Sequence, residues 1–444
     1  MSVEPVDSGD DPDWPSPRPA PERLAECVET FRRWLHMPDP GALCITLATV
    51  AANRAEGDPV WLLVVGPPGG GKTEMIQSVG GQPDVHAAAT LTEGSLLSGV
   101  ARRERSKDAK GGLLREIGEF GILLHKDFGS VLSMNRDARA QVLAAFREIY
   151  DGSWTRHVGT DGGRTLSWSG KIGLIAGCTP AIDSHHAVMG SMGERFVLYR
   201  MPVVDADTQA RRALRHVGRE ASMRKELAAA VDRVLSWVGM PELTRSPDNA
   251  TTDRLVSLAT LAVRCRSAVE RDTYTREVTL IPEPEAPARF VLVLLRLLNS
   301  LRAIGTSEET AWALVGKCAL DSMPAIRRTV LEDLVRRDAV ATTTDIGERT
   351  GYPTTTTRRA LEDLSAHRVV DRHTSGPGHA DGWLVSSWAR DRWLSVPEMS
   401  VNYTDRGVGD HETDRIRLSF FTDDDKSGTP SIEDDYPRSA WDSG

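Results

Sequence analysis

The 444-residue sequence has little of what marks secreted, metal-binding or membrane proteins. Its five cysteines lie far apart and form no C-x-x-C pair, which excludes a zinc-finger pattern and a disulfide framework. The most apolar run of the C-terminal half, residues 290–298, contains Arg296 and is too short to cross a bilayer. Residues 1–21 are acidic and proline-rich rather than basic and then apolar, so we expect no signal peptide. These absences predict a soluble cytoplasmic protein that has no membrane partner.

The net charge of −9 comes from the two ends of the chain. Residues 1–22 carry a charge of −5 and residues 401–444 a charge of −6, which leaves about +2 for residues 23–400. Both ends have the composition of disordered segments. The acidity of the whole chain therefore neither favours nor excludes a nucleic-acid partner.

One strong motif is present, WLLVVGPPGGGKT at residues 61–73. It places G-x-x-x-x-G-K-T between an apolar strand and a helix expected from Glu74, the context that gives this pattern its meaning. Glycines let backbone N–H groups surround phosphate oxygens, the lysine reaches the β- and γ-phosphates, and the threonine hydroxyl ligates Mg²⁺. We therefore expect ATP and Mg²⁺ as cofactors. The predicted nucleotide-binding residues are Gly66, Pro67, Pro68, Gly69, Gly70, Gly71, Lys72, Thr73 and Glu74, with Thr73 also a metal ligand.

A second apolar strand, residues 122–124, leads to Asp127. The acid on the Mg²⁺ side of a P-loop NTPase stands at the end of a strand next to the P-loop strand. Asp127 is therefore the predicted second metal ligand and a catalytic candidate. The alternative is that Asp127 only caps the following helix.

The remaining patterns divide the chain into five parts. A helix at 136–150, a β-hairpin at 154–170 and strands at 172–176 and 196–201 continue the α/β core. Three short helices and a two-stranded wing end the ordered chain. We expect a disordered acidic tail (1–21), a P-loop core with N-terminal helices (22–203), a helical lid (204–322), a winged helix-turn-helix (323–398) and a disordered acidic tail (399–444).

The order of these motifs resembles that of the AAA+ ATPases. It runs from the P-loop through the strand-end acid, a helix and a hairpin to a strand that ends in Thr179, and then to GERF at 193–196. Within that superfamily it looks most like the branch of minichromosome-maintenance helicases and MoxR-type ATPases. Similar P-loop proteins occur among phage-like replication genes. The resemblance covers residues 62–321 and implies a three-layer α/β P-loop NTPase core, a helical lid and a ring-like homo-oligomer.

The resemblance also implies roles for individual residues. Thr179 would be sensor 1, which positions the attacking water, and Arg195 would be an arginine finger that enters the neighbouring subunit's site. Arg289 would be sensor 2, with Arg264 and Arg266 as rivals. The family's second strand ends in Asp-Glu, but here Lys126 and Phe128 flank Asp127. Hydrolysis is therefore expected to be slow, unless Glu148 or Glu194 supplies the missing carboxylate.

Two segments are candidates for contacts with DNA. In the helicases that the chain resembles, the hairpin at 154–170 lines a pore, which would make Arg156 and Arg164 contacts to the phosphate backbone; a solvated hairpin without a ligand is the alternative. The helix-turn-helix would present Thr355, Thr356, Arg358 and Arg359 to the major groove. Winged helices also dock proteins, so a protein partner is the alternative there.

The sequence supports two main hypotheses. The first is a DNA-associated AAA+ ATPase, a helicase, loader or initiator of a phage-like or mobile element. The second is an ATP-gated regulatory or defence switch that binds DNA or a protein and turns over little ATP. A MoxR-type ATPase that remodels proteins is a third possibility, but it would have no need of the winged helix.

Overall fold

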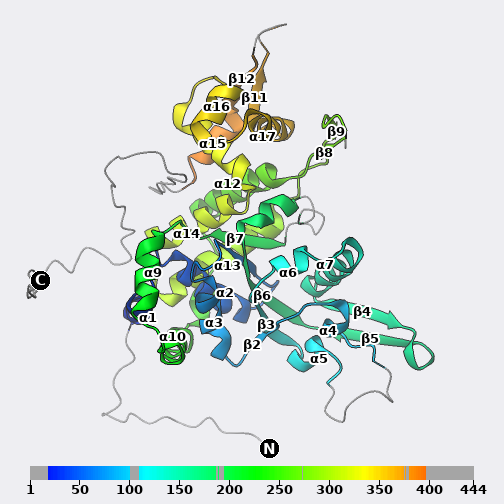
Figure 1. Ribbon diagram of the computed structural model, residues 1–444, viewed down its shortest axis with the longest axis vertical. Coiled ribbons are helices and arrows are strands. Elements are labelled where there is room, and N and C mark those ends of the chain that lie inside the picture. Colours follow the sequence, from blue (N-terminus) through cyan, green and yellow to red (C-terminus); the bar gives the residue numbers. More distant parts are fainter. Residues whose placement is uncertain are drawn as a thin grey trace, which may run out of the picture.

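The computed structural model describes residues 19–100, 110–186, 189, 195–272, 274–374, 376 and 380–396. Within them a five-stranded parallel sheet lies among helices, and a smaller module of helices and three short strands follows (Figure 1). The expected mixed α/β class is confirmed. Helix α1 (Ala20–Trp34) includes the last two residues of the expected N-terminal tail, 1–21, and residues 1–18 of that tail lie outside the described residues, as do 399–444.

The sheet has the order β2-β3-β6-β1-β7. Its strands are β1 (Trp61–Val65), β2 (Val85–Ala87), β3 (Phe120–His125), β6 (Lys171–Cys178) and β7 (Phe196–Arg200). The central strand β1 pairs with both β6 and β7, and Trp61 lies opposite Leu174 and Phe196. The sequence placed the acid-bearing strand directly beside the P-loop strand, and this detail is wrong, because β6 separates β3 from β1. Since all strands are parallel, their C-terminal ends meet at one edge, here called the carboxyl edge, and their beginnings at the amino edge.

Side chains of β1 alternate between two apolar cores, as the pleat requires. Leu62 and Val64 face one core, and Trp61, Leu63 and Val65 face the other. The first core contains α1, α2 (Gly41–Arg54), α3 (Lys72–Ser78), α13 (Ala288–Ile304) and α14 (Glu308–Asp321); the second contains α4 (Glu93–Leu96), α5 (Leu113–Ile117), α6 (Gly129–Leu132), α7 (Arg136–Tyr150) and the hairpin of β4 (Ser153–Val158) and β5 (Arg164–Ser169). Helix α2 is buried on all sides, as its uniformly apolar and small residues predict.

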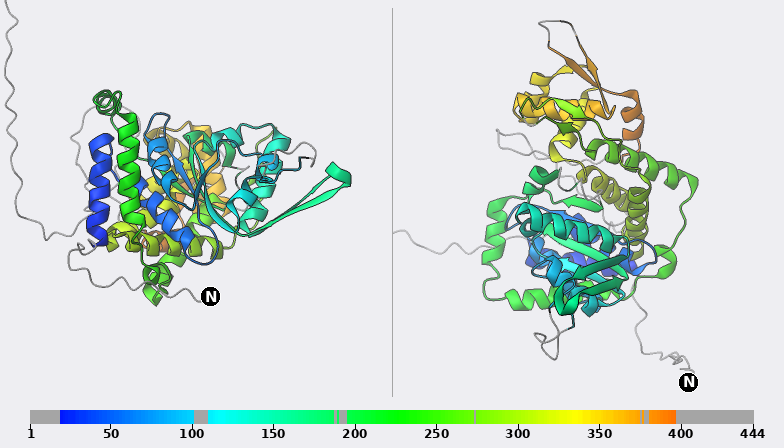
Figure 2. Two further views of the ribbon diagram at one scale, coloured as in Figure 1. Left: turned by 90° about the horizontal axis from the view of Figure 1, so that it is seen from below. Right: turned by 90° about the vertical axis from the view of Figure 1, so that its right-hand side faces the viewer.

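The region between β7 and α14 is rich in helices, as expected of a lid. It consists of α9 (Ala206–Leu214), α10 (Glu220–Leu235), α11 (Met240–Leu243), α12 (Asn249–Arg266) and α13. Helix α10 runs alongside α1 at one side of the core (Figure 2). Between α12 and α13 a small hairpin of β8 (Glu270–Arg271) and β9 (Val278–Leu280) projects outward, which the sequence did not predict. None of the helices built from the described residues has the length and apolar character needed to cross a membrane.

The C-terminal module follows the expected order of elements. It comprises α15 (Ala325–Arg337), β10 (Ala341–Thr342), α16 (Thr343–Thr350), α17 (Thr354–Ala366), β11 (Val370–His373), β12 (Gly382–Val385) and α18 (Ser387–Trp393). The strands pair antiparallel in the order β10-β12-β11. Thr342 and Asp345 form a capping box that starts α16, and Gly351, in the left-handed conformation, ends it. These local signals account for the turn between α16 and α17.

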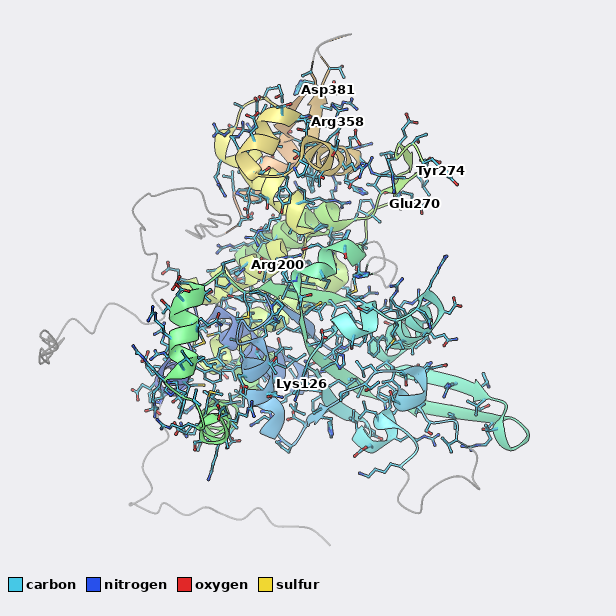
Figure 3. The ribbon with its side chains drawn as sticks, viewed as in Figure 1. Lys126, Arg200, Glu270, Tyr274, Arg358 and Asp381 are labelled. Carbon is cyan, nitrogen blue, oxygen red and sulfur yellow. The ribbon has the colours of Figure 1, made fainter. Side chains whose placement is uncertain are left out.

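A buried charge network joins the sheet, the lid and the C-terminal module. Arg200, at the end of β7, forms two hydrogen bonds of 2.8 Å with Asp183, which also accepts from the N–H of Ala325, the first residue of α15. Asp321, which is fully buried, accepts from the Arg200 N–H at 2.7 Å and from Lys317 and Arg328. Arg200 accordingly lies between the sheet and the module (Figure 3).

Asp321→Asn should lower the free energy of unfolding by about 3–5 kcal/mol, because it removes the buried negative charge that Lys317 and Arg328 share, although Arg328 keeps its pair with Glu332. Asp338→Asn is the matched control: its ion pair with Arg390 is exposed, so the loss should be under about 1 kcal/mol. Urea unfolding followed by circular dichroism measures both values. Equal losses would show that the Asp321 network does not hold the three parts together.

Candidate functional site

The P-loop connects β1 to α3 at the carboxyl edge. Gly69 and Gly71 have φ values of 74° and 80°, in the left-handed region that favours glycine, and a Cβ at either would meet nothing within 4 Å. Conformation rather than crowding therefore requires these two glycines, and the space beside them is open. The N–H of Gly66 donates to the Cys178 carbonyl of β6 at 3.1 Å, which ties the start of the loop to the sheet.

Lys72 is folded back onto the loop. Its Nζ donates to the carbonyl oxygens of Gly66 and Pro67 at 2.7 and 2.6 Å. Burial lowers the pKa of Lys72, against the raising influence of Cys178 and Asp127. A partly desolvated ammonium that rests on neutral carbonyls would gain from charged acceptors such as phosphate oxygens. The loop therefore fits an anionic ligand.

Asp127 and Thr179 lie at the same edge as the P-loop. Asp127 is exposed two residues beyond β3, and its carboxylate acts to raise the pKa of Lys72. Its Oδ1 also accepts from the N–H of Gly129, the first residue of α6, at 3.0 Å, although the N-cap position of that helix is Phe128. Thr179 follows β6 directly, is half-buried, and its hydroxyl caps no helix. The structure thus brings Lys72, Asp127 and Thr179 to one edge.

A close approach of two backbones fixes Asp127 relative to the P-loop. The N–H of Phe128 donates to the Gly177 carbonyl at 2.8 Å. A Cβ on Gly177 would lie 2.6 Å from the Lys126 carbonyl oxygen, so a larger residue would push the end of β3 away from β6. Glycine at position 177 therefore has a positional reason that the sequence alone did not reveal.

The residues present fit a magnesium ion bound together with phosphates. The Thr73 hydroxyl and the Asp127 carboxylate are both exposed at the carboxyl edge. Mg²⁺ in nucleotide sites takes one or two protein carboxylates, and phosphates and water complete its shell. Among the residues that the structure describes, no group of three or more His, Cys, Asp and Glu side chains is arranged to hold a metal.

Two residues of the expected lid that the sequence did not single out contact the segment predicted to bind nucleotide. Gln209 of α9 donates its amide N–H to the Gly69 carbonyl at 3.0 Å. Arg224 of α10 forms hydrogen bonds of 3.0 and 2.8 Å with Glu74 of α3. Glu74, expected to bind nucleotide, is therefore engaged by the lid. No sequence motif predicts either contact, because the two residues of each pair are far apart in the sequence.

Arg195 lies at the amino edge, across the sheet from the P-loop. The five residues of β1, at about 3.3 Å each, separate the two edges by roughly 16 Å. The Arg195 side chain is 8% exposed, pairs with Asp151 at 2.8 Å and lies over the Tyr150 ring. It therefore cannot reach the P-loop of its own chain, and a role in a neighbouring chain stays a prediction.

Arg289 is at the amino edge too. It pairs with Glu285 at 3.3 Å and lies 5.8 Å from the centre of the Tyr150 ring that Arg195 also faces. An interpretation of Arg289 as a sensor of its own chain's phosphates does not fit this placement. Burial, foremost, raises the pKa of Tyr150 to about 12, so its hydroxyl is neutral between the two arginines.

The rival residues are no better placed. Arg266 is buried and pairs with Glu285 at 2.9 Å, and Arg264 lies over the Trp388 ring. Glu148 stands two residues before Tyr150, hence near the amino edge, so it does not replace the missing carboxylate in its own chain. Glu194 lies outside the described residues.

The β4–β5 hairpin extends far from the core (Figure 2), yet its arginines face the protein. Arg156 pairs with Glu93 at 3.0 Å and donates to the Leu97 carbonyl at 2.7 Å. Arg164 donates to the Val100 carbonyl at 3.4 Å. Both side chains hold the hairpin against the segment around residues 93–100. The expectation that these two arginines are poised for DNA is not supported by their contacts.

The four residues predicted to contact DNA from a helix-turn-helix lie on one helix, α17, and their role stays a prediction. Thr355, Thr356, Arg358 and Arg359 are exposed on the amino-terminal half of α17. Thr357, between them, is buried and anchors the helix. Figure 3 shows Arg358 at the outer surface of the C-terminal module. The positions suit contacts with a ligand that the module receives from outside.

Comparisons with known proteins give little support to any assignment. No protein-family model matches the chain, and no curated protein matches it. Among the solved structures that resemble it is the A form apo structure of the NrS-1 C-terminal region, which is 10% identical and covers 84% of this chain and 79% of that one, with a TM-score of 0.24. A likeness at that level carries no argument about fold or function.

Proposed function

We propose that the chain binds ATP and Mg²⁺ at the carboxyl edge and hydrolyses ATP there. The observation that carries this proposal is the convergence of Lys72, Asp127 and Thr179 beside a glycine-rich loop with open space over Gly69 and Gly71. In open α/β sheets, ligands bind outside the carboxyl ends of the strands. No other part of the sequence carries a motif of comparable specificity.

Each residue has a distinct task in this proposal. Lys72 leaves the loop carbonyls and neutralises β- and γ-phosphate charge. Thr73 and Asp127 would hold Mg²⁺, which when bound would supply further positive charge next to the phosphates. The hydroxyl of Thr179 orients the attacking water. Phe128 rather than a glutamate follows Asp127, so the carboxylate that would act as general base in the resembled family is missing at this position and turnover should be slow.

We further propose that the AAA+ resemblance holds and that the substrate of the motor is DNA. Support comes from the C-terminal module, whose helices and three-stranded antiparallel sheet have the order of a winged helix. Its helix α17 exposes two threonines and two arginines, which suit phosphate and guanine contacts. A helicase, loader or initiator of a phage-like element that forms a ring fits both parts.

One observation favours the second candidate, an ATP-gated switch with little turnover. Arg195 is buried in a pair with Asp151, so entering a neighbour's site would require that pair to break. Together with the missing glutamate, this arrangement suits a protein whose nucleotide state, rather than rapid turnover, is the signal. Its partner would then bind α17, whether DNA or protein.

Purified protein should hydrolyse ATP, and duplex or single-stranded DNA should accelerate the reaction. Asp127→Ala should lower the stimulated rate by about 100-fold or more, because Mg²⁺ would lose the carboxylate proposed to bind it. Asp137→Ala, at an exposed acid in the first turn of α7, is the matched control and should leave the rate unchanged. Tight ATP binding with negligible turnover, with or without DNA, would contradict the proposed DNA motor and favour the ATP-gated switch.

Arg195→Ala should lower kcat by about 10³-fold while ATP affinity stays unchanged, if Arg195 completes a neighbour's site. Asp151→Asn separates this role from a structural one, because it releases the guanidinium without removing it. We expect Asp151→Asn to keep most of the activity. Similar losses of rate in the two variants would show that the ion pair only stabilises the fold.

A further inference from the structure

The β8–β9 hairpin lies beside α17 of the C-terminal module. It leaves the lid between α12 and α13 and projects alongside the module in two views at right angles (Figures 1 and 2). Figure 3 places Tyr274 at its outer end and Arg358 on the neighbouring module. The hairpin thus belongs to the lid by sequence and accompanies the helix-turn-helix in space.

One arginine anchors the hairpin to α17. Arg271 is 15% exposed and donates to Glu362 at 2.8 Å and to Asp363 at 2.7 Å. It also donates to the carbonyl oxygen of Arg359 at 3.2 Å and, across the hairpin, to that of Arg276 at 2.9 Å. Asp363 is held in addition by Arg327 at 2.9 Å. This half-buried network fixes the direction of the hairpin relative to α17.

The anchor lies on the side of α17 that would meet DNA. Thr355, Arg359 and Glu362 are spaced i, i+4 and i+7, so they share one face of the helix. The amino-terminal part of this face carries the exposed Thr355 and Arg359, and the carboxyl-terminal part receives Arg271. A duplex that contacts the amino-terminal part of this face would therefore lie next to the β8–β9 hairpin.

The tip of the hairpin exposes groups that bind phosphate. Tyr274 is 93% exposed, and Arg276 is exposed as well. Asp272 is turned inward, where its Oδ1 accepts from the N–H groups of Tyr274 and Thr275 at 2.8 and 2.7 Å. The acid thus shapes the turn, while the phenol and the guanidinium point outward. Both are side chains that commonly contact phosphates and sugars.

We propose that the β8–β9 hairpin is a second DNA-contacting element, which binds the backbone of the duplex next to the segment read by α17. This inference rests on the proposed binding of DNA by α17. Tyr274 lies in the turn of the hairpin, three residues beyond the anchor, so a contact made there adds to those made by α17. Such a contact is independent of base sequence and lengthens the site that the module covers.

The test is titration of full-length protein with a fluorescent 30-base-pair duplex of mixed sequence at several salt concentrations. Tyr274→Ala/Arg276→Ala should weaken binding about 10-fold, and loss of one phosphate contact should reduce the salt slope by about 0.9. Arg271→Ala, which removes the anchor and no exposed group of the tip, should weaken binding similarly. Leu214→Ala/Arg215→Ala, at exposed positions at the end of α9, is the matched control and should have no effect.

A fourth variant separates this inference from the function on which it rests. Arg358→Ala/Arg359→Ala should weaken binding more strongly than the tip variant, because it removes two groups from α17. If this variant binds like the wild type, the proposed role of α17 is wrong. If it is impaired but the tip and anchor variants are not, α17 binds DNA and the hairpin inference is overturned. Melting temperatures of all variants exclude loss of fold as the cause.

Discussion

The site depends on the parallel pairing of β1 with both β6 and β7. Because this pairing is parallel, the P-loop after β1 and Thr179 after β6 emerge at one edge without any further contact. The pairing of β3 with β6, closed by the approach of Phe128 to Gly177, adds Asp127 to the same edge. Because β7 is parallel to β1, Arg195, which directly precedes β7, lies at the opposite edge, beside Tyr150 and Arg289. If the proposed hydrolysis of ATP takes place at the carboxyl edge, Arg195 can take part in it only from a second chain.

Features that depend on neighbouring residues could be predicted from the sequence. The apolar run at 61–65, the glycines after it, and the capping residues around α16 define their own conformations, so these elements were found nearly at their true boundaries. Asp127 and Thr179 were found for the same reason, since each directly follows an apolar strand. Thr355, Thr356, Arg358 and Arg359 of α17 are exposed, because one amphipathic pattern decides which side of the helix faces outward.

Features that depend on distant residues could not be predicted. Strand order was missed by one place, because no local signal tells whether β6 or β3 pairs with β1. The arginines of the β4–β5 hairpin looked free, but Glu93, some sixty positions away, takes up Arg156. The anchoring of β8–β9 by Glu362 and Asp363 joins residues about ninety positions apart. The orientation of a charged side chain depends on its ion-pair partners, which are often distant in sequence. A single sequence does not show which residues these partners are.

The most direct test of the nucleotide site is a crystal structure of the chain with Mg²⁺ and a non-hydrolysable ATP analogue. We expect Lys72 Nζ to leave the Gly66 and Pro67 carbonyls and to contact the β- and γ-phosphates, with the metal between Thr73 and Asp127. Thr179 should lie nearest the γ-phosphate. Nucleotide bound elsewhere, or a triphosphate in the loop with Lys72 still on the carbonyls, would contradict the assignment of the carboxyl edge as the site of ATP chemistry.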